Sequence, residues 1–265
     1  MFADTPAGKV VISLSGGMDS TGLLMHLLAK DCEVYGLSFN YGQKHVIEIE
    51  RLKANIAYLN ENKIHIQHTV IDLSVLGTLY NSALTDPDWK VPEGHYEADN
   101  MKQTVVPNRN AIFSSIAYGY ALSIATKDEN KKERVSIALG VHSGDHVIYP
   151  DCRREFYEAQ HKAFVEGNWD AELVDLYLPY LEGNKHTILQ DAEVTTKKLG
   201  LDFDTVFRNT ITCYDPDDSG RSSGKTGADV ERIEAFVKLG RKDPIEYQTT
   251  WETLKATYNS LESSP

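Results

Sequence analysis

The residues best suited to chemistry form one short loop, Ser15-Gly16-Gly17-Met18-Asp19-Ser20, between an apolar run and a helical pattern. Glycines at such a turn let the backbone approach an anion, and a helix N-terminus offers unpaired N–H groups and a positive dipole. The Ser15 and Ser20 hydroxyls can add hydrogen bonds, whereas Asp19 suits a phosphate site only if it holds the loop or a Mg²⁺ ion. The alternative is an ordinary strand-to-helix turn with Ser and Asp as caps. The flanking pattern favours a pyrophosphate-binding loop.

A second glycine-rich stretch, residues 219–226, superficially resembles a Walker phosphate loop. Ser219 occupies the position of its first required glycine, and no apolar strand precedes it. We therefore exclude a second phosphate loop there.

The elements that must position the first loop follow from the apolar patterning. The residues from Lys9 to Leu14 form a nearly unbroken apolar run, which is typical of a parallel strand buried on both faces. Further strands are predicted at Val34–Phe39, Ile64–Leu73, Val135–Val141 and Leu173–Leu178. Helices are predicted at Asp19–Lys30, Lys44–Leu59, Asn108–Thr126 and Asp151–Glu166, with another that begins at Thr187 and ends before Gly200.

This alternation of strands and helices predicts an α/β fold with a parallel sheet and flanking helices. Ligands of such sheets bind at the carboxyl ends of the strands, which is where the loop falls. Residues 74–104 show no clear periodicity, and a segment of this length is usually a functional lid or a flexible excursion.

Composition restricts the partners of the protein. The formal net charge of −12 argues against a protein that coats duplex nucleic acid, and the basic run Lys131-Lys132-Glu133-Arg134 is interpreted as a solvated loop. The three cysteines, Cys32, Cys152 and Cys213, cannot build a disulfide framework. No apolar run approaches the roughly 18 residues of a membrane span, and the N-terminus lacks a signal pattern. We expect a cytoplasmic protein without nucleic-acid or membrane partners.

The 15–20 loop resembles the PP-loop of the N-type ATP pyrophosphatases, which include GMP synthetase, NAD synthetase, asparagine synthetase and tRNA-modifying enzymes. The resemblance implies a Rossmann-like (adenine nucleotide alpha hydrolase-like) fold and cleavage of ATP between the α and β phosphates, with AMP placed on a substrate oxygen. It also implies that Mg²⁺ accompanies the ATP. A tRNA thiolase would need a paired or catalytic cysteine arrangement, which the isolated cysteines do not provide.

Four further stretches narrow the resemblance to the 7-cyano-7-deazaguanine synthase (QueC) family. They occur in matching order between about Val10 and Gly224, and they are Phe39-Asn40-Tyr41-Gly42-Gln43-Lys44-His45, Val106-Pro107-Asn108-Arg109-Asn110, residues 140–156 (Gly-Val-His-Ser-Gly-Asp to Tyr-Pro-Asp-Cys-Arg-Arg-Glu-Phe) and Thr212-Cys213-Tyr214-Asp215. The family adenylates 7-carboxy-7-deazaguanine, admits ammonia to form the amide, and activates the amide again to give the nitrile. The resemblance therefore implies an ATP-dependent ligase.

The same resemblance assigns roles to individual residues. Catalysis falls to Ser15, Asp19, Ser20 and Lys185, where Lys185 steadies the polyphosphate or the charge at the acyl centre. ATP binding falls to Ser13, Leu14, Ser15, Gly16, Gly17, Asp19, Ser20 and Phe39. Substrate binding falls to Tyr41, Gln43, His45, Arg109, His142, Asp145, Tyr149 and Asp151.

The residue types are compatible with these roles, and each also has a structural alternative. Arg109 offers a planar fork for a carboxylate or phosphate, or it is a buried ion-pair partner. Phe39 and Tyr41 can stack on a purine-like ring, although Tyr41 also suits core packing. The carboxylates at 145 and 151 can accept hydrogen bonds from a guanine-type N–H edge or hold Mg²⁺. The histidines at 45 and 142 suit the scaffold as well as the site, and Cys152 suits packing.

The family carries a four-cysteine zinc site, and here the chain departs from it. Cys213 is retained, but the other three positions hold Ser223, Thr226 and Asp229. Structural zinc requires thiolate or imidazole ligands, so we predict that zinc is absent. The pattern predicts an apolar helical stripe after Asp229 that packs in place of the metal.

We therefore predict two parts, a PP-loop domain over residues 1–210 and a small C-terminal helical segment over residues 211–265. The predicted product is an amide or nitrile, with ammonia as acceptor. The alternatives are conjugation of the activated deazaguanine to a protein amine, as in QueC-like proteins of antiviral or DNA-modification gene clusters, and a non-catalytic nucleotide-binding module. A homodimer is expected.

Overall fold

The computed structural model of the protein describes residues 2–43, 47–86, 88–94, 99–144 and 149–262. Its centre is a sheet of five parallel strands in the order β3-β2-β1-β4-β5. The strands are β1 (Lys9–Ser13), β2 (Glu33–Asn40), β3 (Gln67–Asp72), β4 (Val135–Ala138) and β5 (Val174–Tyr177). The predicted α/β fold is thereby confirmed.

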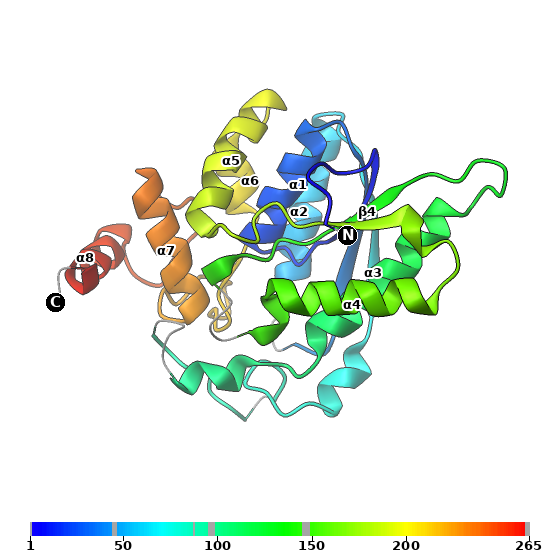
Figure 1. The fold of residues 1–265 in the computed structure, drawn as a ribbon. Helices are drawn as coiled ribbons and strands as arrows, with labels where there is room; N and C mark the ends of the chain where they lie inside the picture. The colour runs from blue at the N-terminus through cyan, green and yellow to red at the C-terminus, as the bar shows by residue number, and fades with distance from the viewer. Residues whose placement is uncertain (1, 44–46, 87, 95–98, 145–148, 263–265) are drawn as a thin grey trace.

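Helices cover both faces of this sheet (Figure 1). They are α1 (Met18–Ala29), α2 (Ile47–Glu61), α3 (Arg109–Ala125), α4 (Arg154–Gly167), α5 (Lys185–Lys198), α6 (Phe203–Arg208), α7 (Gly227–Leu239) and α8 (Trp251–Glu262). Val10 and Ile12 of β1 pack with α1 and α5 on one face, whereas Val11 packs with α3 on the other. All three of these strand residues are fully buried, which explains the unbroken apolar run.

The order of the strands reverses direction between β1 and β4. From β1 the chain builds outward through β2 to β3, and it then returns to place β4 and β5 on the other side. In parallel sheets a ligand crevice opens at such a switch point, beyond the carboxyl ends of the strands. The Ser15–Ser20 loop follows β1 and therefore lies at this point.

Several element boundaries differ from the prediction. The third strand begins at Gln67 rather than Ile64, and α4 begins at Arg154, after a short 3-10 helix at Pro150–Cys152. The fifth helix begins at Lys185, two residues before Thr187, because Asn184 caps it. This earlier start places Lys185 in the first helical turn.

The segment 74–104 also has more structure than the sequence predicts. It contains the 3-10 helices Ser74–Thr78 and Asp99–Thr104. Leu84 and Val91 from this segment are buried in a small apolar cluster that Tyr41 and Tyr214 contact. The segment therefore packs against the carboxyl-end side of the sheet.

The C-terminal segment continues the helical layer that contains α1 and α5. Helix α7 packs against α5, and α8 packs against α7 (Figure 1). The division at residue 210 stays a prediction. Among the described residues, no helix combines the length and the apolar character that a membrane span requires.

Candidate active site

The PP-loop is held by hydrogen bonds among its own residues. The Ser15 and Ser20 hydroxyl oxygens lie 3.1 Å apart, and the Gly17 amide donates to the Ser15 hydroxyl at 3.1 Å. Gly17 is the N-cap of α1, and no side chain caps this helix. The interpretation of the loop as an ordinary turn with Ser and Asp caps is therefore not what the structure shows. The first-turn amides of α1 are left for an anion.

Gly16 shows why the loop requires glycine. Its φ angle is +87°, and a Cβ atom there would lie 2.1 Å from the carbonyl oxygen of Glu48. Only glycine accepts both this backbone conformation and the contact. The close approach brings the first turn of α2 against the loop, and with it the Glu48 side chain.

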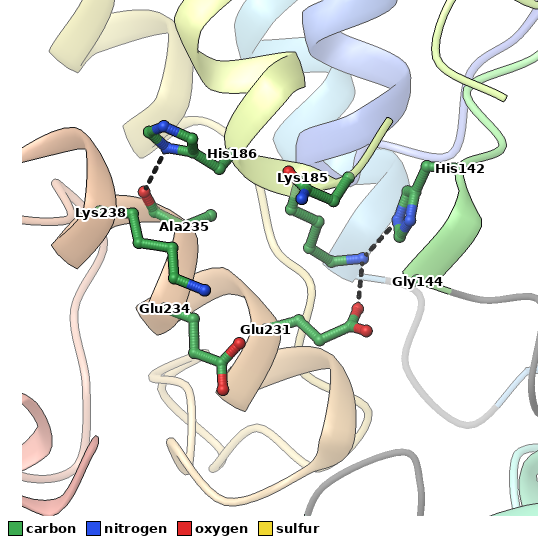
Figure 2. Close-up of a pocket in the computed structure, with 9 residues that line it drawn as sticks. His142, Gly144, Lys185, His186, Glu231, Glu234, Ala235 and Lys238 are labelled. Atoms are coloured by element: carbon green, nitrogen blue, oxygen red, sulfur yellow. Dashed lines mark hydrogen bonds and ion pairs between the residues drawn. The ribbon is translucent and has the colours of Figure 1, made fainter. Parts of the chain in front are cut away.

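Lys185 lies at the centre of a charged cluster beside the loop. Its ammonium nitrogen is 3.2 Å from Oδ2 of Asp19. It also lies 3.0 Å from Oε2 of Glu231 and 2.9 Å from Nε2 of His142 (Figure 2). These partners come from the PP-loop, from α7 and from the segment after β4. A lysine that is 5% exposed keeps its charge only with such compensation.

The electrostatics of this cluster suit a ligand that brings a cation. Burial alone raises the pKa of the Asp19 carboxyl, but the Lys185 ammonium and hydrogen bonding with His142 outweigh it and hold the pKa well below its usual range. Asp19 is therefore ionised. Its Oδ1 atom is buried and has no hydrogen-bond partner among the described residues. A buried carboxylate oxygen of this kind fits a Mg²⁺ ion carried by ATP.

A cavity opens at the carboxyl ends of β1 and β2, and we name it the strand-end cavity. It is lined by Ser13, Leu14, Ser15, Ser38, Phe39, Tyr41, Glu48, Ile49, Arg109, Asn110, Phe113 and Tyr214. The rings of Phe39 and Phe113 stack in parallel, with centroids 4.0 Å apart. The cavity thus joins the first serine of the PP-loop to Arg109, with aromatic rings in its wall.

Arg109 faces this cavity among aromatic hydroxyls. Its guanidinium carbon lies 5.9 Å from the centre of the Tyr41 ring, and Asn110 accepts a hydrogen bond from its Nε at 3.3 Å. No ion pair to a carboxylate is found for Arg109 within the described part of the chain, so a buried structural ion pair is not what the structure shows there. Its planar fork therefore suits an anionic ligand.

Glu48 adds an acidic group to the same cavity. Burial raises the pKa of its carboxyl to about 7, and the positive charge of Arg109 opposes this shift without cancelling it. A carboxyl that changes charge near neutral pH inside a cleft is a frequent feature of functional sites.

The comparisons with known proteins agree with this geometry. The sequence model of the family described as "Queuosine biosynthesis protein QueC" matches residues 9–240. The 7-cyano-7-deazaguanine synthases of Marinomonas sp. (strain MWYL1) and Methanoregula boonei are each 43% identical to the chain. The matches cover 91% of this chain and 98% and 99% of those proteins, respectively. The chain belongs to the QueC family.

The structure also places the other residues that the sequence assigns to the site. His142 lies in the Lys185 cluster rather than in the strand-end cavity. Gln43 folds back onto its own loop, where its Oε1 accepts from the Tyr41 amide at 2.9 Å. The Tyr149 hydroxyl is hydrogen-bonded to Thr104 at 2.6 Å, so this buried ring supports the wall behind Arg109.

Asp151 lies in the short 3-10 helix before α4, and its buried Oδ1 has no hydrogen-bond partner among the described residues. Cys152 is buried and accepts from the Asn110 side chain at 3.5 Å, which agrees with packing. His45 and Asp145 lie outside the described residues.

The four positions of the family's zinc site do come together, but as a hydrogen-bonded cluster. The Cys213 sulfur lies 3.5 Å from the Ser223 hydroxyl, which donates to Asp229 at 3.0 Å. The Thr226 hydroxyl also donates to Asp229 at 3.0 Å and caps α7. Burial and the Asp229 charge raise the pKa of the Cys213 thiol to about 12, so it remains protonated.

This donor set does not fit zinc, because one protonated thiol and two hydroxyls are poor replacements for thiolates. No group of three or more His, Cys, Asp and Glu side chains that could hold a metal occurs within the residues that the structure describes. The absence of zinc from the protein stays a prediction.

Residues 241–258, which we call the tail, lie beyond the family match and are hydrogen-bonded to the segment that contains Ser222 and Arg232. Arg232 is fully buried and donates to both carboxylate oxygens of Asp243, at 2.6 and 2.9 Å. The Tyr247 hydroxyl donates to Asp243 at 2.7 Å, and the Ser222 amide donates to the Glu246 carbonyl at 3.0 Å. The tail is therefore an integral part of the structure.

Sequence reasoning missed Glu48, Glu231 and the Arg232–Asp243 pair as contributors to the site or its support. The position of Glu48 in the first turn after the Tyr-Gly-Gln stretch was a usable signal. Glu231 and Arg232 had no local signal, because their partners are 46 and 11 residues away in the sequence and meet them only in the fold.

Proposed function

We propose that the protein is an ATP-dependent enzyme that adenylates the carboxylate of 7-carboxy-7-deazaguanine, or of a close analogue, and converts it to an amide or nitrile with ammonia. The observation that carries this proposal is the strand-end cavity, which runs from Ser15 of the PP-loop to Arg109. A substrate carboxylate at Arg109 would lie next to a nucleotide whose phosphates contact the loop. Family membership supports a deazaguanine substrate.

Each group has a part in the proposed reaction. The loop amides, the Ser15 and Ser20 hydroxyls and Lys185 would bind the β and γ phosphates of ATP, and Asp19 would hold Mg²⁺. Arg109 would orient the substrate carboxylate. One oxygen of that carboxylate would attack the α phosphorus of ATP as the bond to pyrophosphate breaks. Ammonia then attacks the acyl carbon, loses a proton and expels AMP, which gives the amide. For the nitrile, a second ATP would adenylate the amide oxygen with release of pyrophosphate, and loss of both N–H protons and of AMP would form the C≡N bond.

The charged cluster supports the need for a divalent cation. Asp19 and Glu231 supply two carboxylates for the single Lys185 ammonium. A polyphosphate brought alone to this cluster would meet an excess of negative charge. Mg²⁺ bound to ATP would offset that charge.

The experiment that tests the proposal is incubation with ATP, Mg²⁺, 7-carboxy-7-deazaguanine and ammonia. We expect AMP, pyrophosphate and the amide or nitrile, detected by mass spectrometry. If nucleotide binds but neither AMP nor pyrophosphate forms with the acid, the protein is a nucleotide-binding module and the proposal is wrong. If the acid is activated and ammonia is not consumed, the acceptor is wrong.

A second candidate acceptor is a protein amine. It is favoured by the altered C-terminal segment, because Tyr214, next to Cys213, lines the strand-end cavity. Hydrogen bonds hold this segment, so any difference in acceptor would come from its shape rather than from freedom of the chain. A product linked to a protein from a neighbouring gene, found by intact-mass measurement, would support this candidate.

A further inference from the structure

The contact between Glu231 and Lys185 joins two parts of the chain that the sequence separates. Lys185 begins α5, whereas Glu231 lies on α7, in the segment that replaces the family's zinc region. Their charged atoms are 3.0 Å apart, and the side chains are 6% and 11% exposed. Figure 2 shows the Glu231 carboxylate directed at the lysine from the side opposite His142.

Helix α7, which carries Glu231, is held in place by hydrogen bonds of the neighbouring residue. The next residue, Arg232, donates to Asp243 of the tail and also to the Thr210 hydroxyl at 2.8 Å. Thr210 is directly followed by Ile211, whose amide donates to the Gly16 carbonyl of the PP-loop at 3.1 Å. The Arg232 side chain thus connects α7 both to the tail and to the segment that contacts the loop.

A lysine side chain requires contacts of this kind if its ammonium is to stay at one position in the site. Its flexible four-carbon side chain loses substantial rotamer entropy when it is fixed, so contacts from neighbouring side chains are needed to hold the ammonium in one place. Asp19 belongs to the loop and would turn part of its charge toward Mg²⁺ when ATP binds. Among the described residues, Glu231 is the carboxylate that stays with Lys185 in that state.

We infer that Glu231 is a positioning residue that holds the Lys185 side chain directed at the phosphates of ATP. The inference rests on the proposed function, and it extends the active site to α7 and the tail. Glu231 acts through Lys185 and does not itself contact the reacting atoms.

The test is a double-mutant cycle on pyrophosphate release driven by 7-carboxy-7-deazaguanine. Glu231→Gln should lower kcat about 10- to 100-fold, as is typical of residues that orient a charged group in a site, with a smaller change in the KM for ATP. Glu231→Asp, which keeps the charge, should recover part of the rate. In a Lys185→Ala background the Glu231→Gln change should have less than about a twofold effect, because its target is gone. Independent, multiplicative losses would overturn the inference.

Glu234→Gln is the matched control. Glu234 lies three residues further along α7 and lines the same pocket, but the dashed contacts of Lys185 in Figure 2 run to Glu231 and His142. It removes the same charge from the same helix, so kcat should stay within about twofold of the wild type. A loss equal to that of Glu231→Gln would show that charge on α7, rather than the contact with Lys185, matters, and it would overturn the inference.

A second measurement needs no turnover and separates this inference from the proposed function. Limited acylation of lysines followed by peptide mass spectrometry should label Lys185 several-fold faster in Glu231→Gln than in wild type, with Lys238 as internal reference. Unchanged labelling of Lys185 would overturn the inference. If the wild-type protein released no pyrophosphate, the proposed function would fail while the labelling result would still decide whether Glu231 holds Lys185.

Discussion

The PP-loop and the Arg232–Asp243 pair of the C-terminal segment differ in how far their buried polar groups are satisfied by hydrogen bonds. At the loop, Oδ1 of Asp19 has no hydrogen-bond partner among the described residues, and no side chain caps α1. In the C-terminal segment, Arg232 donates to both oxygens of Asp243, to two threonine hydroxyls and to a carbonyl. Buried groups that stabilise a fold are normally saturated in this way.

The difference indicates that the loop serves ligand binding and that the ion pair serves stability. A polar group left without a partner costs stability, and it persists where a ligand completes it. In the C-terminal segment the Arg232–Asp243 pair is saturated, and hydrogen bonds join Cys213, Ser223, Thr226 and Asp229 where the family uses a metal, with Oδ1 of Asp229 left without a partner among the described residues. We expect changes at the loop to affect turnover, and changes in the Arg232–Asp243 pair to affect stability.

The largest effect should come from the PP-loop itself. Ser15→Ala and Asp19→Ala should each lower substrate-dependent pyrophosphate release by at least about 100-fold, because each removes a group aimed at the phosphates or their cation. Circular dichroism melts should show that the fold survives. Ser123→Ala, which removes a hydroxyl from the exposed face of α3, is the control and should behave as wild type. Normal pyrophosphate yields from a folded Ser15→Ala or Asp19→Ala protein would remove the PP-loop assignment.

The next largest effect concerns the buried ion pair. Asp243→Asn should lower the free energy of unfolding by about 3–5 kcal/mol, because Arg232 would be left charged and incompletely paired in the interior. Arg241→Ala is the matched control. Arg241 pairs with Glu193 and Asp204 at similar distances, but these side chains are 35–44% exposed. A pair of this kind contributes about 0.2–1 kcal/mol. Urea denaturation measures both, and equal losses would contradict the proposed contrast.

The raised pKa of Glu48 predicts that the free energy of unfolding depends on pH. Its pKa of about 7 in the folded protein lies above the ordinary value of 4.5, so the folded state binds the extra proton. The contribution to stability is fully present below pH 4.5 and is lost as the pH rises through 7, by at most about 3 kcal/mol. Glu48→Gln should remove this dependence in ligand-free protein. Denaturation curves between pH 4.5 and 8 that are parallel for wild type and variant would contradict the assigned pKa.

Arg109→Ala should impair turnover far more than stability. A charge-assisted contact to a bound anion is worth about 1.5–3 kcal/mol, which corresponds to a fall of about 10- to 150-fold in kcat/KM for the deazaguanine acid. The measurement is steady-state kinetics with a thermal melt on the same sample. An unfolded variant that kept full activity per folded molecule would instead indicate a structural arginine.

The smallest expected effect is that of metal removal on the C-terminal segment. Because hydrogen bonds rather than thiolate ligands join Cys213, Ser223, Thr226 and Asp229, a zinc chelator should leave the melting temperature unchanged. Elemental analysis should find no stoichiometric zinc. One tightly bound equivalent would refute the prediction and would remove the contrast between the two regions.

The sequence by itself determined the α/β fold, the PP-loop and the family. These depend on local patterns, namely an apolar run that is buried on both faces of a sheet, glycines at a strand-to-helix turn, and motifs in a fixed order. Even Lys185 was assigned through such a motif, although its helix begins two residues earlier than predicted because of the Asn184 cap.

Only the tertiary structure decided what completes the site. Glu48 acquires its raised pKa from burial, and Arg109, which is 61 residues away in the sequence, opposes that shift. Glu231 reaches Lys185 because α7 packs against α5, and Arg232 is neutralised by a tail residue. Burial and charge pairing between distant segments depend on how the elements pack, and one chain's local pattern does not encode those distances. For this reason the loop could be found by inspection of the sequence, whereas the support behind it required the fold.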